Sequence, residues 1–145
     1  MQNWDDEINE IMQKKMKQYI EKMNVTETNY KINKETNHNI PIILTDYNFT
    51  ESINKIQFLI VDFWAAWCGP CKMVSPIIEQ LSNELAGKAV FGKLNVDENP
   101  HVSNAFDIQS IPTIIIFKNG KAVDRIIGAM TKSQFLLKIS SHIER

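Results

Sequence analysis

The two cysteines of this chain lie three positions apart, at the junction of two different patterns of apolar residues. Residues 58–66, which precede them, are apolar except for Asp62, and such a run predicts a strand buried on both faces. The apolar residues that follow recur at the helical intervals of three and four: Val74, Ile77, Ile78, Leu81 and Leu85. Cys68 is therefore predicted at a strand-to-helix turn, with Cys71 about one helical turn later.

The start of a helix favours the reactive form of a cysteine. Free N–H groups and the positive end of the helix dipole stabilise a thiolate at Cys68 relative to the neutral thiol. Cys71 lies close enough to close a small ring with Cys68 but faces the protein interior. One thiol can attack a disulfide and the other can resolve the mixed disulfide, so the pair predicts dithiol–disulfide exchange.

Composition and charge narrow the class of protein further. A length of 145 residues, 43% of them hydrophobic, suits one domain with an extension at one end. A net charge of -1 gives no reason to expect nucleic acid or an anionic membrane as a partner. The chain has only two cysteines, which indicates a reducing compartment such as the cytoplasm. It has no apolar run of about 18 residues, so we expect no membrane span. Residues 5–7 are acidic, where a signal peptide would need basic residues, so we expect no signal peptide.

Residues 1–39 are predicted to form an extension, an amphipathic helix followed by a polar linker. Apolar residues recur there at spacings of three and four: Trp4, Ile8, Ile11, Met12, Met16, Tyr19, Ile20 and Met23. Residues 24–39 are polar and without period, as in an extended linker. Three roles stay open for the helix: packing on its own domain, docking a partner or self-associating, and remaining mostly disordered.

Residues 40–145 are predicted to form an α/β domain, a mixed central sheet with helices on both faces. The predicted strands are 40–44, 58–64, 90–96, 113–117 and 121–127. The Asn119–Gly120 pair predicts a hairpin turn that brings the last strand back antiparallel at an edge. Four helices are predicted. The first begins with an Asn48–Glu51 capping box, and the second spans 68–86 with a kink at Pro76. The third begins at Asn99 and Pro100, and the fourth is capped by Thr131 and Gln134. Sites in such sheets form at the carboxyl ends of strands, where Cys68 falls.

Asp62 is the one charged residue in the central apolar strand, six positions before Cys68. A carboxylate buried without a partner costs several kcal/mol, so we expect its pKa to rise. We expect Asp62 to reach beneath the helix and to accept the proton of Cys71 when that thiol attacks. Lys93, on the next strand, is its expected partner; a buried ion pair with a structural role only is the alternative.

Seven further residues are expected to form the substrate-binding surface around the cysteines: Trp67, Gly69, Pro70, Ile111, Pro112, Gly128 and Ala129. Trp67 is expected to shield the sulfur, while Gly69 and Pro70 restrict the turn between the thiols. A proline that begins a strand, as Pro112 does, marks either an edge or a cis bond that turns the chain sharply. Free backbone groups at such a turn can pair with an extended substrate segment.

Six segments in this order resemble the thioredoxin family: Val61–Ala65, Trp67–Lys72, Lys93–Asp97, Ile111–Thr113, Phe117–Gly120 and Gly128–Ala129. The resemblance covers about residues 40 to 145 and implies the thioredoxin fold and a general protein-disulfide reductase recycled by a thioredoxin reductase. It implies that Cys68 attacks, that Cys71 resolves, and that Pro112 is cis and lines the substrate groove. Ala66 and Ser110 depart from the residues that many members carry, and the extension lies outside the family's span.

Three competing interpretations remain. A zinc site needs about four ligands, and His38, His101 and His142 lack ligand spacing to the two cysteines, so we expect no metal and no other cofactor. An oxidase or isomerase would run the same exchange in the other direction; the Gly-Pro pair between the cysteines favours reduction. A scaffold whose N-terminal helix recruits a partner would be non-enzymatic.

Overall fold

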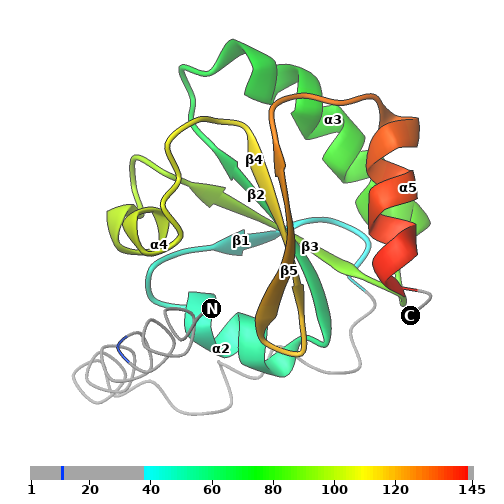
Figure 1. The fold of residues 1–145 in the computed structure, drawn as a ribbon, viewed down its shortest axis with the longest axis horizontal. Helices are drawn as coiled ribbons and strands as arrows, with labels where there is room; N and C mark the ends of the chain where they lie inside the picture. The colour runs from blue at the N-terminus through cyan, green and yellow to red at the C-terminus, as the bar shows by residue number, and fades with distance from the viewer. Residues whose placement is uncertain (1–10, 12–37, 144–145) are drawn as a thin grey trace.

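The computed structural model of the protein describes residue 11 and residues 38–143. Within this part, one five-stranded sheet carries helices on both faces, which confirms the predicted α/β class (Figure 1). The strands are β1 (Ile42–Leu44), β2 (Phe58–Trp64), β3 (Val90–Asn95), β4 (Thr113–Lys118) and β5 (Lys121–Ile127). The helices are α2 (Phe49–Lys55), α3 (Gly69–Glu84), α4 (Pro100–Ala105) and α5 (Lys132–Ile143). The predicted N-terminal helix and linker lie outside the described residues, apart from Ile11 and the last two linker positions.

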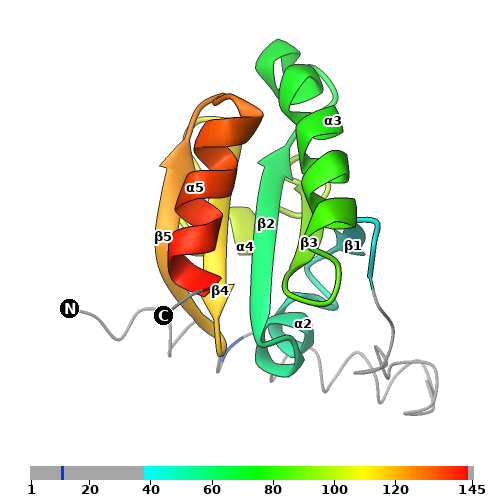
Figure 2. The same ribbon diagram turned by 90° about the vertical axis from the view of Figure 1, so that its right-hand side faces the viewer.

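Strand β2 lies at the centre of the sheet, whose strand order is β1-β3-β2-β4-β5. It runs parallel to β3 and antiparallel to β4, and β5 returns antiparallel to β4 at one edge, as the Asn119–Gly120 turn predicts. Helices α3 and α5 cover one face of the sheet, and α2 and α4 cover the other (Figure 1, Figure 2). The apolar run of β2, interrupted only by Asp62, suits this position because both faces of the strand are buried.

Side chains of β2 alternate between the two faces, so the strand contributes to two apolar cores. The core beneath α2 and α4 contains three residues of β2 and a cluster of edge-to-face rings: Leu59, Val61, Phe63, Phe49, Phe106 and Phe117. The core beneath α3 and α5 contains Phe58 and Ile60 of the same strand. Asp62 continues that second series, and its side chain therefore lies on the α3 side of the sheet, among apolar neighbours.

Two of the three predicted helix caps are wrong in their side-chain contacts. Asn48 does not cap α2, because its amide oxygen turns back and accepts the N–H of Thr45 at 2.7 Å. Asn99 does not cap α4 either, because its side chain accepts the N–H of Asp46 at 2.9 Å. The carboxylate of Asp46 accepts the first N–H groups of α4 instead, from His101 and Val102 at 3.2 and 2.9 Å.

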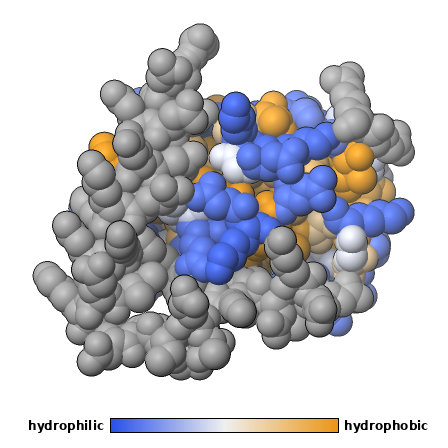
Figure 3. Space-filling view, turned by 90° about the horizontal axis from the view of Figure 1, so that it is seen from below, coloured by the Kyte–Doolittle hydropathy of each residue, from blue (hydrophilic) through white to orange (hydrophobic). Residues whose placement is uncertain are grey.

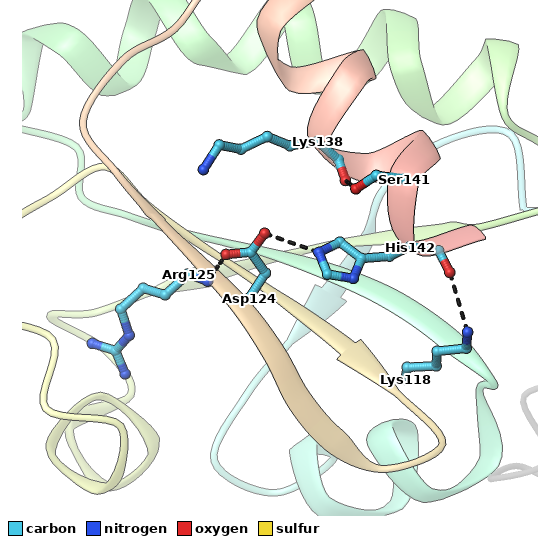
Figure 4. A network of polar contacts seen from close by, with 6 residues as sticks. All are labelled: Lys118, Asp124, Arg125, Lys138, Ser141 and His142. Atoms are coloured by element: carbon cyan, nitrogen blue, oxygen red, sulfur yellow. Dashed lines mark hydrogen bonds and ion pairs between the residues drawn. The ribbon is translucent and has the colours of Figure 1, made fainter. Parts of the chain in front are cut away.

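The third cap is confirmed, and the helix that it opens is tied to the sheet at its other end. Thr131 N–H donates to the Gln134 side chain at 3.0 Å, and Gln134 N–H donates to Thr131 Oγ1 at 3.2 Å. At the end of α5, His142 Nε2 lies 2.9 Å from Asp124 Oδ2 of β5, and Lys118 Nζ donates to the His142 carbonyl at 3.1 Å (Figure 4). These contacts hold the last turn of α5 over the β4–β5 hairpin.

The surface of the described part is mixed. On the face seen in Figure 3, hydrophilic residues cover most of the visible described surface, with hydrophobic residues showing between them. None of the described helices is both long enough and apolar enough to cross a membrane.

Candidate active site

Cys68 and Cys71 lie where β2 ends and α3 begins, and they are joined by a disulfide bond in this structure. Cys68 is the N-cap residue of α3, and its sulfur accepts the backbone N–H of Cys71 at 3.2 Å. Pro70 stands in the first turn, where its missing N–H costs no helical hydrogen bond. The helix thus begins one residue later than the sequence predicts, because Cys68 caps it and does not belong to it.

The electrostatics of the α3 N-terminus favour negative charge on Cys68. Its first turn contains no acidic residue that would oppose a thiolate. The N–H groups at the start of a helix and the helix dipole both stabilise an anion at this position. Cys68 is buried, with only 3% of the residue exposed, so a thiolate there would be poorly solvated and would depend on these fixed dipoles.

The segment before β4 lies directly against Cys68. The Ile111–Pro112 peptide bond is cis, as the resemblance implies, and the Ile111 carbonyl oxygen lies 3.7 Å from Cys68 Sγ. Gly128, just after β5, donates its N–H to the Pro112 carbonyl at 2.8 Å. Four of the predicted site residues, Cys68, Ile111, Pro112 and Gly128, therefore lie together although 60 positions separate the first from the last.

Trp67 lies at the surface beside the cysteine pair, with 71% of the residue exposed. Its indole N–H donates to Asp97 Oδ2 at 2.9 Å, which fixes the ring next to the turn. Asp97 follows β3 and was not predicted as a site residue; its place at the carboxyl end of a parallel strand was the available signal. Gly69, Pro70 and Ala129 are also exposed at the described surface near this point.

Asp62 is buried on the α3 side, with 1% of the residue exposed and neither carboxylate oxygen hydrogen-bonded. Burial raises the pKa of Asp62 to about 7, against a smaller lowering by the charge of Lys93. Lys93 lies beside Asp62 in the parallel β2–β3 register. The predicted rise in the pKa of the carboxyl is therefore confirmed, and it comes mainly from the loss of water around the group.

Lys93, the expected partner of Asp62, lowers the pKa of that carboxyl through its charge and not through direct contact. Lys93 Nζ donates to Ser75 Oγ of α3 at 2.7 Å and lies 5.0 Å from the centroid of the Trp64 ring. No ion pair within 4.0 Å joins Lys93 to Asp62 among the described residues. Sequence reasoning missed Ser75, although its place one helical turn after Cys71 puts the two residues on one face of α3.

A small cavity of about 100 Å³ opens beside Cys71 and Lys93. Its lining residues are Trp64, Ala65, Ala66, Cys71, Lys72, Ser75 and Lys93. A cavity of this size accommodates water molecules, which can carry a proton between groups that do not touch. Within the described residues, no group of three or more His, Cys, Asp or Glu side chains is arranged to hold a metal ion.

Comparison with known proteins agrees with this geometry. A family model described as Thioredoxin matches residues 40–141. The chain is 51% identical over 100 residues to a thioredoxin of Chlorobaculum thiosulfatiphilum, which covers 68% of this chain and 93% of the relative. A thioredoxin of Staphylococcus haemolyticus is 45% identical over 100 residues, covering 69% of this chain and 95% of the relative.

A solved structure gives the same result for the fold. The chain is similar to a mutant thioredoxin from Halobacterium salinarum, with a TM-score of 0.71 and 26% identity, over 76% of this chain and 96% of the other. The matched region contains the sheet, the cysteine pair at the start of α3 and the cis-proline segment. The chain belongs to the thioredoxin family of thiol–disulfide oxidoreductases.

Proposed function

We propose that this protein reduces disulfide bonds of other proteins, with Cys68 as the attacking thiol and Cys71 as the resolving thiol. The observation that carries this proposal is the position of Cys68 as the N-cap of α3, bonded to Cys71 and in contact with the cis-proline segment. A sulfur at this position is stabilised as a thiolate and lies where a substrate can approach along the Ile111 backbone.

The reaction has two exchange steps. The Cys68 thiolate attacks one sulfur of the substrate disulfide; a mixed disulfide forms, and the other substrate sulfur leaves as a thiolate that takes a proton. Cys71 then loses its proton and attacks Cys68 Sγ, which releases the second substrate thiol. Both electrons pass to the substrate, and the protein is left with the Cys68–Cys71 disulfide seen in this structure.

Asp62 is the proposed proton acceptor for Cys71, and the charge of Lys93 lowers the pKa of Asp62. A pKa of about 7 is close to the pH at which an efficient base must both hold and release a proton. The cavity beside Cys71, which is also lined by Lys93, the register neighbour of Asp62, gives water access to the thiol. The two unpaired oxygens of Asp62 support this role, since a carboxyl that served only in a structural ion pair would have its partner in place.

The substrate is proposed to bind around Cys68, where Trp67, Gly69, Pro70 and Ala129 are exposed, Ile111 and Gly128 are half-buried and Pro112 is buried. Exposure of Trp67 supports this proposal, as does the approach of the Ile111 carbonyl to Cys68 Sγ. An extended segment of the substrate would pair with backbone groups beside Pro112 and place its disulfide over the attacking sulfur. Backbone pairing of this kind demands little of the substrate's side chains, which suits a reductase with many substrates.

The remaining parts of the proposal concern partners and organisation. A thioredoxin reductase is the proposed source of electrons for the next cycle, and the cytoplasm is the proposed location. We assign residues 40–145 to the catalytic domain and residues 1–39 to an extension whose helix docks a partner or self-associates. The domain boundary is supported by the family match, which begins at residue 40.

A trapping experiment tests the assignment of the two thiols. Cys71→Ser leaves the attacking thiol but removes the resolving one, so substrates are expected to accumulate on the variant as mixed disulfides that dithiothreitol releases. Cys68→Ser is the matched control and should trap nothing and show no turnover. Retention of full disulfide-reductase activity by Cys71→Ser would contradict the two-thiol mechanism. A redox titration of the pair separates a reductase from an oxidant, whose potential would lie higher.

A further inference from the structure

We infer that Ser75 is a positioning residue that holds the ammonium group of Lys93 away from Asp62, and so leaves that carboxyl unpaired and free to take the proton of Cys71. The inference rests on the proposed function for the role of Asp62. Three side chains are involved: Ser75 from α3, Asp62 from β2 and Lys93 from β3. Ser75 acts indirectly, by fixing the position of the Lys93 ammonium.

The three groups face one another across the sheet–helix interface. Asp62 and Lys93 are neighbours in the parallel register of β2 and β3. Ser75 and Cys71 stand four residues apart on α3, and both line the cavity together with Lys93. The Lys93 side chain thus has two candidate acceptors nearby, the hydroxyl of Ser75 and the carboxylate of Asp62.

The observed choice of partner is the unexpected one. A lysine next to a buried carboxylate gains most by approaching it, since opposite charges attract strongly where water is excluded. Lys93 Nζ is instead 2.7 Å from Ser75 Oγ, and it lies over the Trp64 ring, 5.0 Å from the ring centroid. Asp62 keeps both oxygens without a hydrogen bond. The hydroxyl and the ring together hold the ammonium on the α3 side of the cavity.

Apart from burial, the position of this one ammonium sets the pKa of Asp62. Its neighbour on β4 in the register is the apolar Ile114, and α3 contributes Cys71, Ser75 and the exposed Lys72 near the cavity. Among the described residues, Lys93 is the only charge that shifts the pKa of Asp62, and it lowers that pKa against the larger effect of burial. An ammonium in direct contact with the carboxylate would lower the pKa much further, because the attraction grows as the distance shrinks.

Ser75→Ala is the test. Without the hydroxyl, Lys93 loses its hydrogen-bond acceptor on α3 and is expected to pair with Asp62, which shifts the carboxyl titration to lower pH by about one unit or more. The measurement is the carbon-13 chemical shift of the Asp62 carboxyl from pH 4 to 10, in the full chain with its disulfide intact. Ser75→Thr keeps a hydroxyl at the same place and should titrate as the natural protein does.

Two further variants make the result specific. Ser82→Ala removes a buried hydroxyl of the same helix that has no hydrogen-bond partner, and it should leave the titration of Asp62 unchanged. In a Lys93→Met background, Ser75→Ala should have no effect, because the residue through which Ser75 acts is gone. An unchanged or raised midpoint in Ser75→Ala would overturn the inference, as would a downward shift that persists without Lys93.

The outcome of this titration does not depend on whether the proposed function is correct. It is an equilibrium measurement on the oxidised protein and needs neither substrate nor turnover. Trapping by Cys71→Ser tests the reductase chemistry, while the Ser75 titration tests only the arrangement around Asp62. If trapping succeeds and the midpoint does not move, the reductase proposal stands and the positioning role of Ser75 falls.

Discussion

Replacing Asp62 with Asn is expected to stabilise the folded protein at neutral and alkaline pH. The buried carboxyl has a pKa of about 7 in the folded state, against the ordinary value of 3.8 that we take for the unfolded chain. The folded state therefore binds this proton more tightly, and above pH 7 it must keep a carboxylate where no hydrogen-bond donor meets it. Asn fills nearly the same space without a charge.

The magnitude follows from the difference between the two pKa values. A gap of about 3 pH units corresponds to roughly 4 kcal/mol, at 1.36 kcal/mol per unit. Because the folded pKa is the higher one, the stability linked to this proton is fully present below the unfolded pKa and is lost as pH rises from about 4 to about 7. Asp62→Asn should therefore match the natural protein near pH 3 and exceed it by roughly 4 kcal/mol at pH 8.

The assay is urea unfolding of the oxidised protein between pH 3 and 9, followed by circular dichroism. The disulfide removes the cysteines from the titration, so the difference between the two proteins reports Asp62 alone. The expected difference in the free energy of unfolding rises through the window from pH 4 to 7 and is flat on both sides. A difference that stays constant across this window, or a variant less stable than the natural protein at pH 8, would refute the reasoning.

Four further predictions follow from other parts of the structure. Asp124→Asn should show the opposite pH dependence: burial raises the pKa of Asp124, but the hydrogen bonds from His142 and from the Arg125 N–H, with the charge of Lys138, outweigh it and hold the pKa below 3.8. The contribution of the Asp124 pair, about 0.5–1 kcal/mol in urea unfolding, is present above the unfolded pKa and is lost as pH falls through the folded one. Asp62→Asn should slow the resolving step on the order of 100-fold while attack by Cys68 is little changed, as stopped-flow tryptophan fluorescence with a disulfide peptide would measure. Gly92→Ala should destabilise the protein by about 1–3 kcal/mol in denaturant unfolding, because a methyl group there runs into the buried Leu44 side chain. Deleting residues 1–36 should leave the reduction of insulin disulfides largely unchanged.

Each of these has an outcome that contradicts it. The Asp124 prediction is contradicted if Asp124→Asn loses no more stability at pH 7 than at pH 3. The kinetic prediction for Asp62 is contradicted if Asp62→Asn slows attack and resolution equally. Gly92→Ala with an unchanged unfolding midpoint would mean that Leu44 moves aside without cost. A large loss of insulin reduction after the deletion would make the extension part of the catalytic unit, against the boundary proposed at residue 40.

Much of the fold was predictable because its determinants are local in the sequence. The apolar run of β2 and the helical spacing that follows Cys68 predict the elements on either side of the cysteines, and the turn between them follows from their order. The Asn119–Gly120 turn in the same way predicts a hairpin and an antiparallel edge strand. Periodicity and turn chemistry involve residues that are close in the sequence, so they can be identified before any tertiary contact is known.

The partners of the polar side chains were not predictable in this way. Lys93 was expected as the partner of Asp62, and its charge does lower the pKa of that carboxyl, but its hydrogen bond goes to Ser75. Asn99 was expected to cap α4 but leaves that role to Asp46, 53 positions earlier in the chain. The contact between Trp67 and Asp97 likewise joins two loops at the ends of neighbouring strands. Each of these choices depends on distances across the sheet and between layers, and a polar group takes whichever acceptor the packing brings within about 3 Å. Local pattern therefore determined where the cysteines stand, while tertiary packing alone decided which groups surround the buried carboxyl beside them.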